Sequence, residues 1–175
     1  MKTPLKLLLF FTLTLHLTTA CTNYYYIVRH AEKAATPADN PPLTQAGQQR
    51  AVVLCDSLRD KGINRIFVSQ FDRTKQTAAP AAGLLGITPI EYTTTAASPN
   101  IEGLADQLRA AGDVNILVVG HTSNIPGLIL NLTGIDIGMI NENDFDNFFV
   151  IKRVRKDGEL TYTLHRRGTY GAPSP

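Results

Sequence analysis

The chain has 175 residues, which is enough for one domain with a full hydrophobic core. Apolar residues make up 43% and charged residues 18%, as in an ordinary globular protein. The formal net charge of +2 falls to zero without Lys2 and Lys6 near the N-terminus. A neutral chain argues against nucleic acid as a partner.

Residues 1–20 have the features of an export signal. Two lysines precede an apolar run at 7–17, which is shorter than a membrane span. The run ends in small residues before Cys21, and this resembles the site at which bacterial lipoproteins are cut and acylated on the cysteine. Two outcomes stay open: a membrane-anchored lipoprotein with lipid on Cys21, or a soluble periplasmic protein cut after Ala20. In either case we expect residues 21–175 to form a single exported domain.

After this segment, strand-like and helix-like stretches alternate. The expected strands are 24–28, 63–69, 89–92, 114–119, 147–154 and 160–165, and helices are expected to begin near Thr44, Phe71, Ile101 and Ser123. Thr44 is a good N-cap for the first helix, and Pro80 is expected to kink or shorten the second. Alternation of this kind predicts an α/β fold, a three-layer αβα sandwich with a mostly parallel, doubly wound sheet. The last two strands, joined at Asp157-Gly158, should form an antiparallel edge.

The two cysteines are not expected to pair. Cys55 falls on the apolar face of the first helix, where a free cysteine behaves as a small hydrophobe. Cys21 is expected to lie before the first strand, with nothing to bring it to Cys55.

Basic side chains follow three of the expected strands. Arg29 and His30 end the first strand, and Arg73 lies just beyond the second. His121 directly follows the strand at 114–119. Because ligands of open α/β sheets lie outside the carboxyl ends of the strands, these side chains can converge at one edge. The simpler alternative for the first pair alone is a strand that exits to solvent on polar residues.

Two guanidinium groups and two imidazoles, with no carboxylate between them, would repel each other unless an anion lay among them. Arginine binds phosphate through a planar fork, and the helix N-termini after Arg73 and His121 add backbone donors. Nearby positive charge lowers the pKa of a histidine and so favours the neutral, nucleophilic imidazole. The group therefore has the parts that phosphoryl transfer requires.

These residues lie within motifs that resemble a known family. The matching residues are Arg29-His30-Ala31-Glu32, Leu43-Thr44 with Gly47 and Arg50-Ala51, Ser69 with Arg73-Thr74 and Gln76-Thr77-Ala78, and Gly120-His121. In this order and spacing they resemble the histidine phosphatase superfamily, also called the phosphoglycerate mutase-like family, over roughly residues 24–168.

The resemblance implies a role for each of the four basic side chains. His30 would attack phosphorus and become a covalent phosphohistidine, which water then hydrolyses. Arg29 and Arg73 would clamp the phosphoryl oxygens, and His121 would stabilise the transition state. His16, in the export signal, and His165, on a late strand, are expected to be uninvolved.

The sequence departs from the family at the acid that protonates the leaving group. Many members carry a glutamate or aspartate after the second helix, where this chain has no acid in residues 93–99. Glu91 and Glu102 flank this segment, and the other candidates are Glu32, Glu142, Asp144 and Asp146. Each has the simpler interpretation of a solvated surface carboxylate.

The leading hypothesis is a metal-independent phosphatase without a cofactor, acting on a phosphorylated small molecule or a phosphoprotein. Without an acid, it should prefer activated phosphoryl donors such as phosphoramidates over alkyl phosphates, whose leaving groups need a proton. The alternative is a phosphoester-binding module with little or no turnover. Membrane contact is expected only through lipid on Cys21, and the oligomeric state is left open.

Overall fold

The computed structural model describes residues 20–174, so the expected export signal, apart from its last residue, and His16 lie outside the described residues. Within the described residues, strands and helices alternate until two consecutive strands end the series. The strands are β1 (Cys21–Arg29), β2 (Ile63–Ser69), β3 (Ile90–Tyr92), β4 (Asn115–Gly120), β5 (Asn147–Lys156) and β6 (Glu159–Thr169). The helices are α1 (Gln45–Leu58), α2 (Asp72–Leu85), α3 (Ile101–Ala110) and α4 (Ile125–Thr133).

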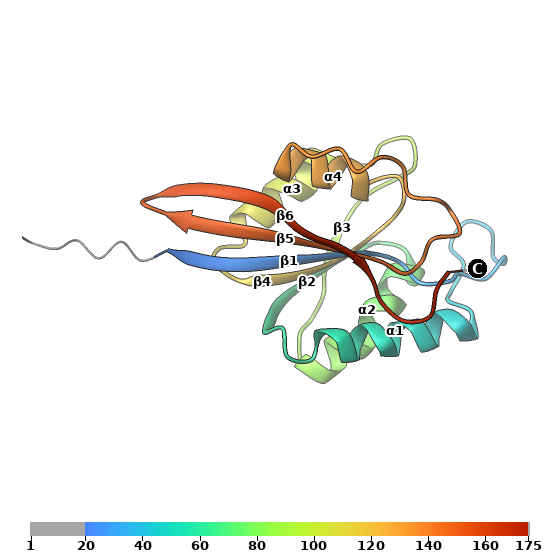
Figure 1. The fold of residues 1–175 in the computed structure, drawn as a ribbon. Coiled ribbons are helices and arrows are strands. Elements are labelled where there is room, and N and C mark those ends of the chain that lie inside the picture. Colours follow the sequence, from blue (N-terminus) through green and yellow to red (C-terminus); the bar gives the residue numbers. More distant parts are fainter. Residues whose placement is uncertain (1–19, 175) are drawn as a thin grey trace, which may run out of the picture.

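The six strands form one sheet in the order β3-β2-β4-β1-β5-β6. The pairs among β1 to β4 are parallel, whereas β5 pairs antiparallel with β1 and with β6. Helices α1 and α2 cover one face of the sheet, and α3 and α4 cover the other (Figure 1). The predicted three-layer α/β sandwich with an antiparallel C-terminal edge is therefore confirmed.

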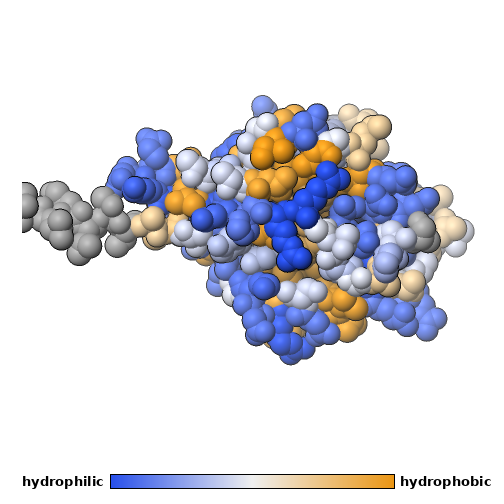
Figure 2. Space-filling view, in the orientation of Figure 1, coloured by the Kyte–Doolittle hydropathy of each residue, from blue (hydrophilic) through white to orange (hydrophobic). Residues whose placement is uncertain are grey.

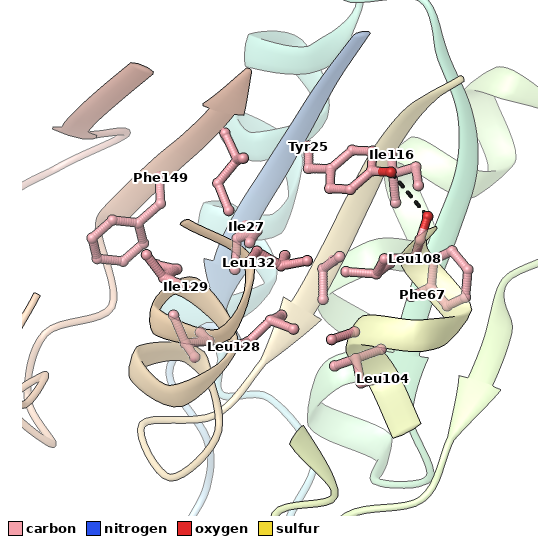
Figure 3. Close-up of a cluster of buried hydrophobic side chains, with 14 of the residues drawn as sticks. Tyr25, Ile27, Phe67, Leu104, Leu108, Ile116, Leu128, Ile129, Leu132 and Phe149 are labelled. Carbon is pink, nitrogen blue, oxygen red and sulfur yellow. Dashed lines mark hydrogen bonds between the residues drawn. The ribbon is translucent and has the colours of Figure 1, made fainter. Parts of the chain in front are cut away.

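Successive residues of β1 point to opposite faces of the sheet and feed two separate apolar cores. Tyr25 and Ile27 pack with α3 and α4, while Tyr26 and Val28 pack with α1 and α2. On the first side the Tyr25 hydroxyl donates a hydrogen bond to the Leu108 carbonyl oxygen at 2.9 Å (Figure 3). Because both faces of β1 are covered, its run of strand-favouring residues is apolar almost without interruption.

Strand β1 begins earlier than expected. Cys21 is the first residue of the strand and lies opposite Arg155 of β5, so the expectation that it precedes the strand is wrong. The long β5–β6 hairpin supplies this pairing, and it extends beyond the helices together with the start of β1 (Figure 1). Hydrophilic residues cover the tip of the hairpin (Figure 2). Within residues 20–174, no helix is both long and apolar enough to cross a membrane.

Helix α2 passes through Pro80 without interruption, so the expected shortening does not occur. Proline in a helix interior costs about 3 kcal/mol, because it lacks an N–H and clashes with the preceding turn. Buried residues lie on both sides of Pro80, with Thr77 and Ala78 before it and Ala81 and Ala82 after it. Packing of this face against α1 and β2 outweighs the local cost. Cys55 is buried on the apolar face of α1, as predicted.

Candidate active site

The parallel register between β1 and β4 brings the two histidines together. Arg29 is opposite Gly120, and the backbone N–H of His30 donates to the Gly120 carbonyl oxygen at 2.9 Å. The residues that follow these two, His30 after β1 and His121 after β4, therefore lie side by side at the same edge of the sheet. The ring centroids of His30 and His121 are 5.3 Å apart, in an edge-to-face arrangement.

His30 is held as a neutral imidazole with one free nitrogen. Its Nδ1 lies 2.8 Å from the Ala31 carbonyl oxygen, which can only accept, so Nδ1 carries the proton and Nε2 keeps its lone pair. Burial lowers the pKa of His30 to about 2, and the neighbouring positive charges of Arg29 and Arg73 act in the same direction. At neutral pH the ring is thus a potential nucleophile.

His121 is fixed by contacts at its ring and at its backbone. Its Nε2 is 2.8 Å from the hydroxyl of Ser69, the last residue of β2, and its N–H donates to the side chain of Asn124 at 2.8 Å. Burial lowers the pKa of His121 to about 3, and the charges of Arg73 and Arg29 add to the effect. Both imidazoles are therefore uncharged at neutral pH.

Arg73 extends from the first turn of α2 along the ring of Phe71, with its guanidinium carbon 4.2 Å from the ring centroid. The Nε atoms of Arg29 and Arg73 are both buried, and neither has a hydrogen-bond partner within the part of the chain that the structure describes. Buried donors are nearly always paired in folded proteins, and a charged donor is especially costly to leave unpaired. Two such donors beside two histidines indicate a site built for an anion.

Arg29 is almost completely buried and is hydrogen-bonded to the loop before β5. Its Nη1 donates to the backbone carbonyl oxygens of Asn141, Glu142 and Asp144, at 3.1, 2.6 and 3.2 Å. Its Nη2 is 2.6 Å from the carboxylate of Glu142. The ring of Phe145 lies 4.3 Å from the guanidinium carbon and also faces His30. The expectation that no carboxylate lies among the four basic groups is wrong, because residues 141–145 fold back onto Arg29.

A pocket of about 250 Å³ opens at this edge of the sheet. Its lining comes from the strand ends and from the loops that follow them, and the residues are His30, Lys33, Asp39, Phe71, Arg73, Thr94, Thr95, Ala96, His121, Thr122, Ser123 and Glu142. Three of the four predicted basic residues thus line one pocket, and the fourth, Arg29, contacts it through Glu142. Among residues 20–174, no His, Cys, Asp and Glu side chains gather closely enough to hold a metal ion.

Three of the acid candidates, Glu32, Glu91 and Glu102, do not line this pocket. Glu32 pairs with the buried Arg50 at 2.6 Å; burial opposes the effect, but the hydrogen bonds from Arg50 hold the pKa of Glu32 below its usual value. Glu91 pairs with Lys75 at 2.9 Å. Glu102 lies in the first turn of α3, outside the pocket lining. None of the three is among the residues that line the pocket, where a general acid would have to reach the leaving group.

Hydrogen bonds from α1 and α2 fix the loop that follows His30. The Ala31 N–H donates to the hydroxyl of Thr77 at 2.9 Å, so α2 holds the residue directly after the histidine. Thr44 caps α1 as predicted, accepting from the Gly47 N–H at 3.1 Å, and its own N–H donates to the Glu32 carbonyl oxygen at 2.9 Å. Several residues of the family motifs therefore support His30 and do not line the pocket.

Sequence reasoning missed three contributors to the site. Asp39 lines the pocket from an aperiodic loop, and Thr122 lines it beside His121. Ser69 was noted as a motif residue without a role, although its position at a strand end is the signal that singled out His121. Glu142 is one of the acid candidates, but no signal in the sequence indicates its contact with Arg29.

Comparison with known proteins links this chain to one family. Residues 25–97 match the model of the histidine phosphatase superfamily, branch 1. A PE-PGRS family protein of Mycobacterium tuberculosis is 49% identical over 55 residues, a match that covers 31% of this chain and 9% of that protein.

Solved structures share the fold at low sequence identity. The protein histidine phosphatase SixA, complexed with tungstate, has 20% identity and a TM-score of 0.67, covering 83% of this chain and 96% of that one. A mycobacterial glucosyl-3-phosphoglycerate phosphatase with inorganic phosphate has 13% identity and a TM-score of 0.62, covering 86% and 97%. At these identities the likeness establishes the fold.

Proposed function

Because this chain resembles the histidine phosphatase superfamily in both sequence and fold, we propose that it is a phosphatase acting through a covalent phosphohistidine on His30. The observation that carries the proposal is the buried, uncharged pair of imidazoles, one with a free nitrogen, beside two buried arginine donors without partners. Such a group fits a phosphoryl anion by charge and by hydrogen-bonding capacity.

In the first step the lone pair on Nε2 of His30 attacks phosphorus, and the bond to the leaving group breaks with its electron pair on that group. The hydrogen bond from Nδ1 to the Ala31 carbonyl oxygen orients the ring and supports the positive charge that it gains. Water then attacks the phosphohistidine, which releases phosphate and restores neutral His30. Arg29, Arg73 and His121 would hold the phosphoryl oxygens during both steps.

The substrate class is inferred from residues 93–99, the segment in which many members of the family carry their acid. Thr94, Thr95 and Ala96 of this segment line the pocket and carry no carboxyl group, and the carboxylates of the lining, Asp39 and Glu142, belong to other loops. We therefore propose that activated phosphoryl donors, such as phosphoramidates and aryl phosphates, are favoured over alkyl phosphates, whose alkoxides need a proton to depart. The two phosphatases compared above act on different substrates by their names, so the family alone does not decide between these classes.

Single-turnover labelling tests the proposal. The protein is mixed with a radiolabelled phosphoramidate and quenched in alkali, which preserves phosphohistidine. Label should appear on the wild-type protein and on His165→Asn, which removes a histidine from β6, but not on His30→Asn. Saturable phosphate binding without label on any variant would instead support the binding module.

Export and lipidation form a separate proposal. We propose that residues 1–20 direct export and that Cys21 receives the lipid, which would place the protein at a membrane surface. Labelled palmitate should be incorporated in the cells of origin by the wild-type protein and by Cys55→Ser, the buried-cysteine control, but not by Cys21→Ser. Equal labelling of both variants would contradict the assignment.

A further inference from the structure

The carboxylate of Glu142 occupies the position where an anion would bind Arg29. One oxygen lies 2.6 Å from Nη2 of Arg29, and the other accepts a hydrogen bond from the hydroxyl of Thr122. Both Glu142 and Thr122 line the pocket that also contains the two histidines. A phosphoryl oxygen entering this pocket would require the same two donors.

The contact leaves the arginine fork half used. Nε and Nη2 of a guanidinium group lie side by side and bind two oxygens of a carboxylate or phosphate together. Of these two donors of Arg29, only Nη2 binds the carboxylate of Glu142, while Nε has no partner among residues 20–174. A single carboxylate oxygen is therefore a partial substitute for a ligand that could use both donors.

The two partners differ sharply in how firmly they are held. The side chain of Arg29 is 1% exposed, and three backbone carbonyl oxygens would keep it in place if the carboxylate left. The side chain of Glu142 is 72% exposed and belongs to the irregular loop of residues 134–146. An exposed carboxylate is readily solvated, and a phosphoryl anion that takes its place keeps the buried guanidinium paired, so the exchange avoids the cost of an unpaired buried charge.

We propose that Glu142 is a resident carboxylate that the phosphoryl group of the substrate must displace from Arg29 and Thr122. The inference rests on the proposed phosphatase site and assigns Glu142 a role in selecting the substrate. After displacement, the carboxylate stays at the pocket rim, where it repels any second negative charge carried next to the phosphoryl group. The substrates that fit best carry a single phosphoryl group without an adjacent anionic group.

Calorimetric titration with inorganic phosphate near neutral pH tests the displacement without requiring turnover. Glu142→Gln keeps the size of the side chain but removes its charge, so phosphate should bind about five- to tenfold more tightly than to wild type. The matched control is Glu102→Gln, which makes the same change at an exposed carboxylate of α3 outside the pocket lining. Long-range charge alone should change its affinity by about twofold or less.

A second measurement concerns selectivity. The ratio of kcat/KM for phenyl phosphate to that for 4-carboxyphenyl phosphate should fall in Glu142→Gln and stay unchanged in Glu102→Gln. Equal or weaker phosphate binding by Glu142→Gln, or equal gains in both variants, would overturn the displacement role while leaving the phosphatase proposal standing. Failure of every variant to bind phosphate would overturn both.

Discussion

Acidification from about pH 7.5 to 5 should destabilise this protein through its two buried histidines. Burial lowers the pKa of His30 to about 2 and that of His121 to about 3, against a usual value of 6.5. In the folded protein both rings stay neutral at pH 5, while in the unfolded chain both take up a proton. The unfolded state thus binds more protons, so stability is complete above about pH 6.5 and is lost as the pH falls towards the folded pKa values.

The magnitude follows from the pKa difference. One pKa unit corresponds to about 1.4 kcal/mol of folding free energy. The usual histidine pKa of 6.5 is about 1.5 units above pH 5. At pH 5 each histidine should therefore lower the free energy of unfolding by about 2 kcal/mol, and the pair should lower it by about 4 kcal/mol. Carboxyl groups titrate mostly below this range, so the loss between pH 6.5 and 5 belongs chiefly to the histidines.

Urea unfolding at a series of pH values, followed by circular dichroism, measures this loss. His30→Gln with His121→Gln should remove most of the pH dependence, while His165→Gln on β6 should leave it unchanged. A free energy of unfolding that changes by less than about 1 kcal/mol between pH 7.5 and 5 in the wild-type protein would refute the assignment of two neutral, buried imidazoles.

Three further predictions concern the supports of the site and the packing of its helices. Ser69→Ala should lower kcat about tenfold and shift the pH profile, because His121 loses its ring partner; Ser57→Ala, which removes an exposed hydroxyl of α1, is the control for the same assays. Gly47→Ala should destabilise the protein by about 2 kcal/mol or more, because its Cβ would overlap a backbone carbonyl oxygen after β1 that cannot move aside; chemical denaturation measures the loss. Gly83→Ala on α2, where nothing lies within 4 Å of the added Cβ, should instead raise stability by about 0.5–1 kcal/mol in the same experiment.

The rule that ligands bind at the carboxyl ends of parallel strands was sufficient to predict the meeting of His30 and His121. It succeeds because the hydrogen-bonded register between β1 and β4 places both residues at the same edge of the sheet, independently of the conformation of the chain between them. Arg73 joins them by the same logic, because it lies in the first turn of the helix that follows β2. The lengths of the strands were less predictable, since β1 is extended by its pairing with a hairpin encoded more than 120 residues later.

Contacts made by irregular loops could not be predicted from the sequence. Glu142 and Asp39 belong to segments without periodicity, and no local pattern indicates which carboxylate will fold back onto a buried arginine. The same limit applies to Pro80, where tertiary packing on both sides of the residue overrides a local preference. Sequence alone thus located the basic groups but not the acidic partner that they bind.

Strand β1 links the proposed lipid attachment at Cys21 to the proposed nucleophile His30. Cys21 begins the strand and His30 follows its last residue, so its nine residues, at about 3.3 Å each, set the two ~30 Å apart. An acyl chain on Cys21 would hold the amino end of the sheet against the lipid, and the reactive edge would open towards the aqueous compartment. The pocket would then be equally accessible to dissolved phosphoryl donors in a lipid-anchored and in a soluble form of the domain.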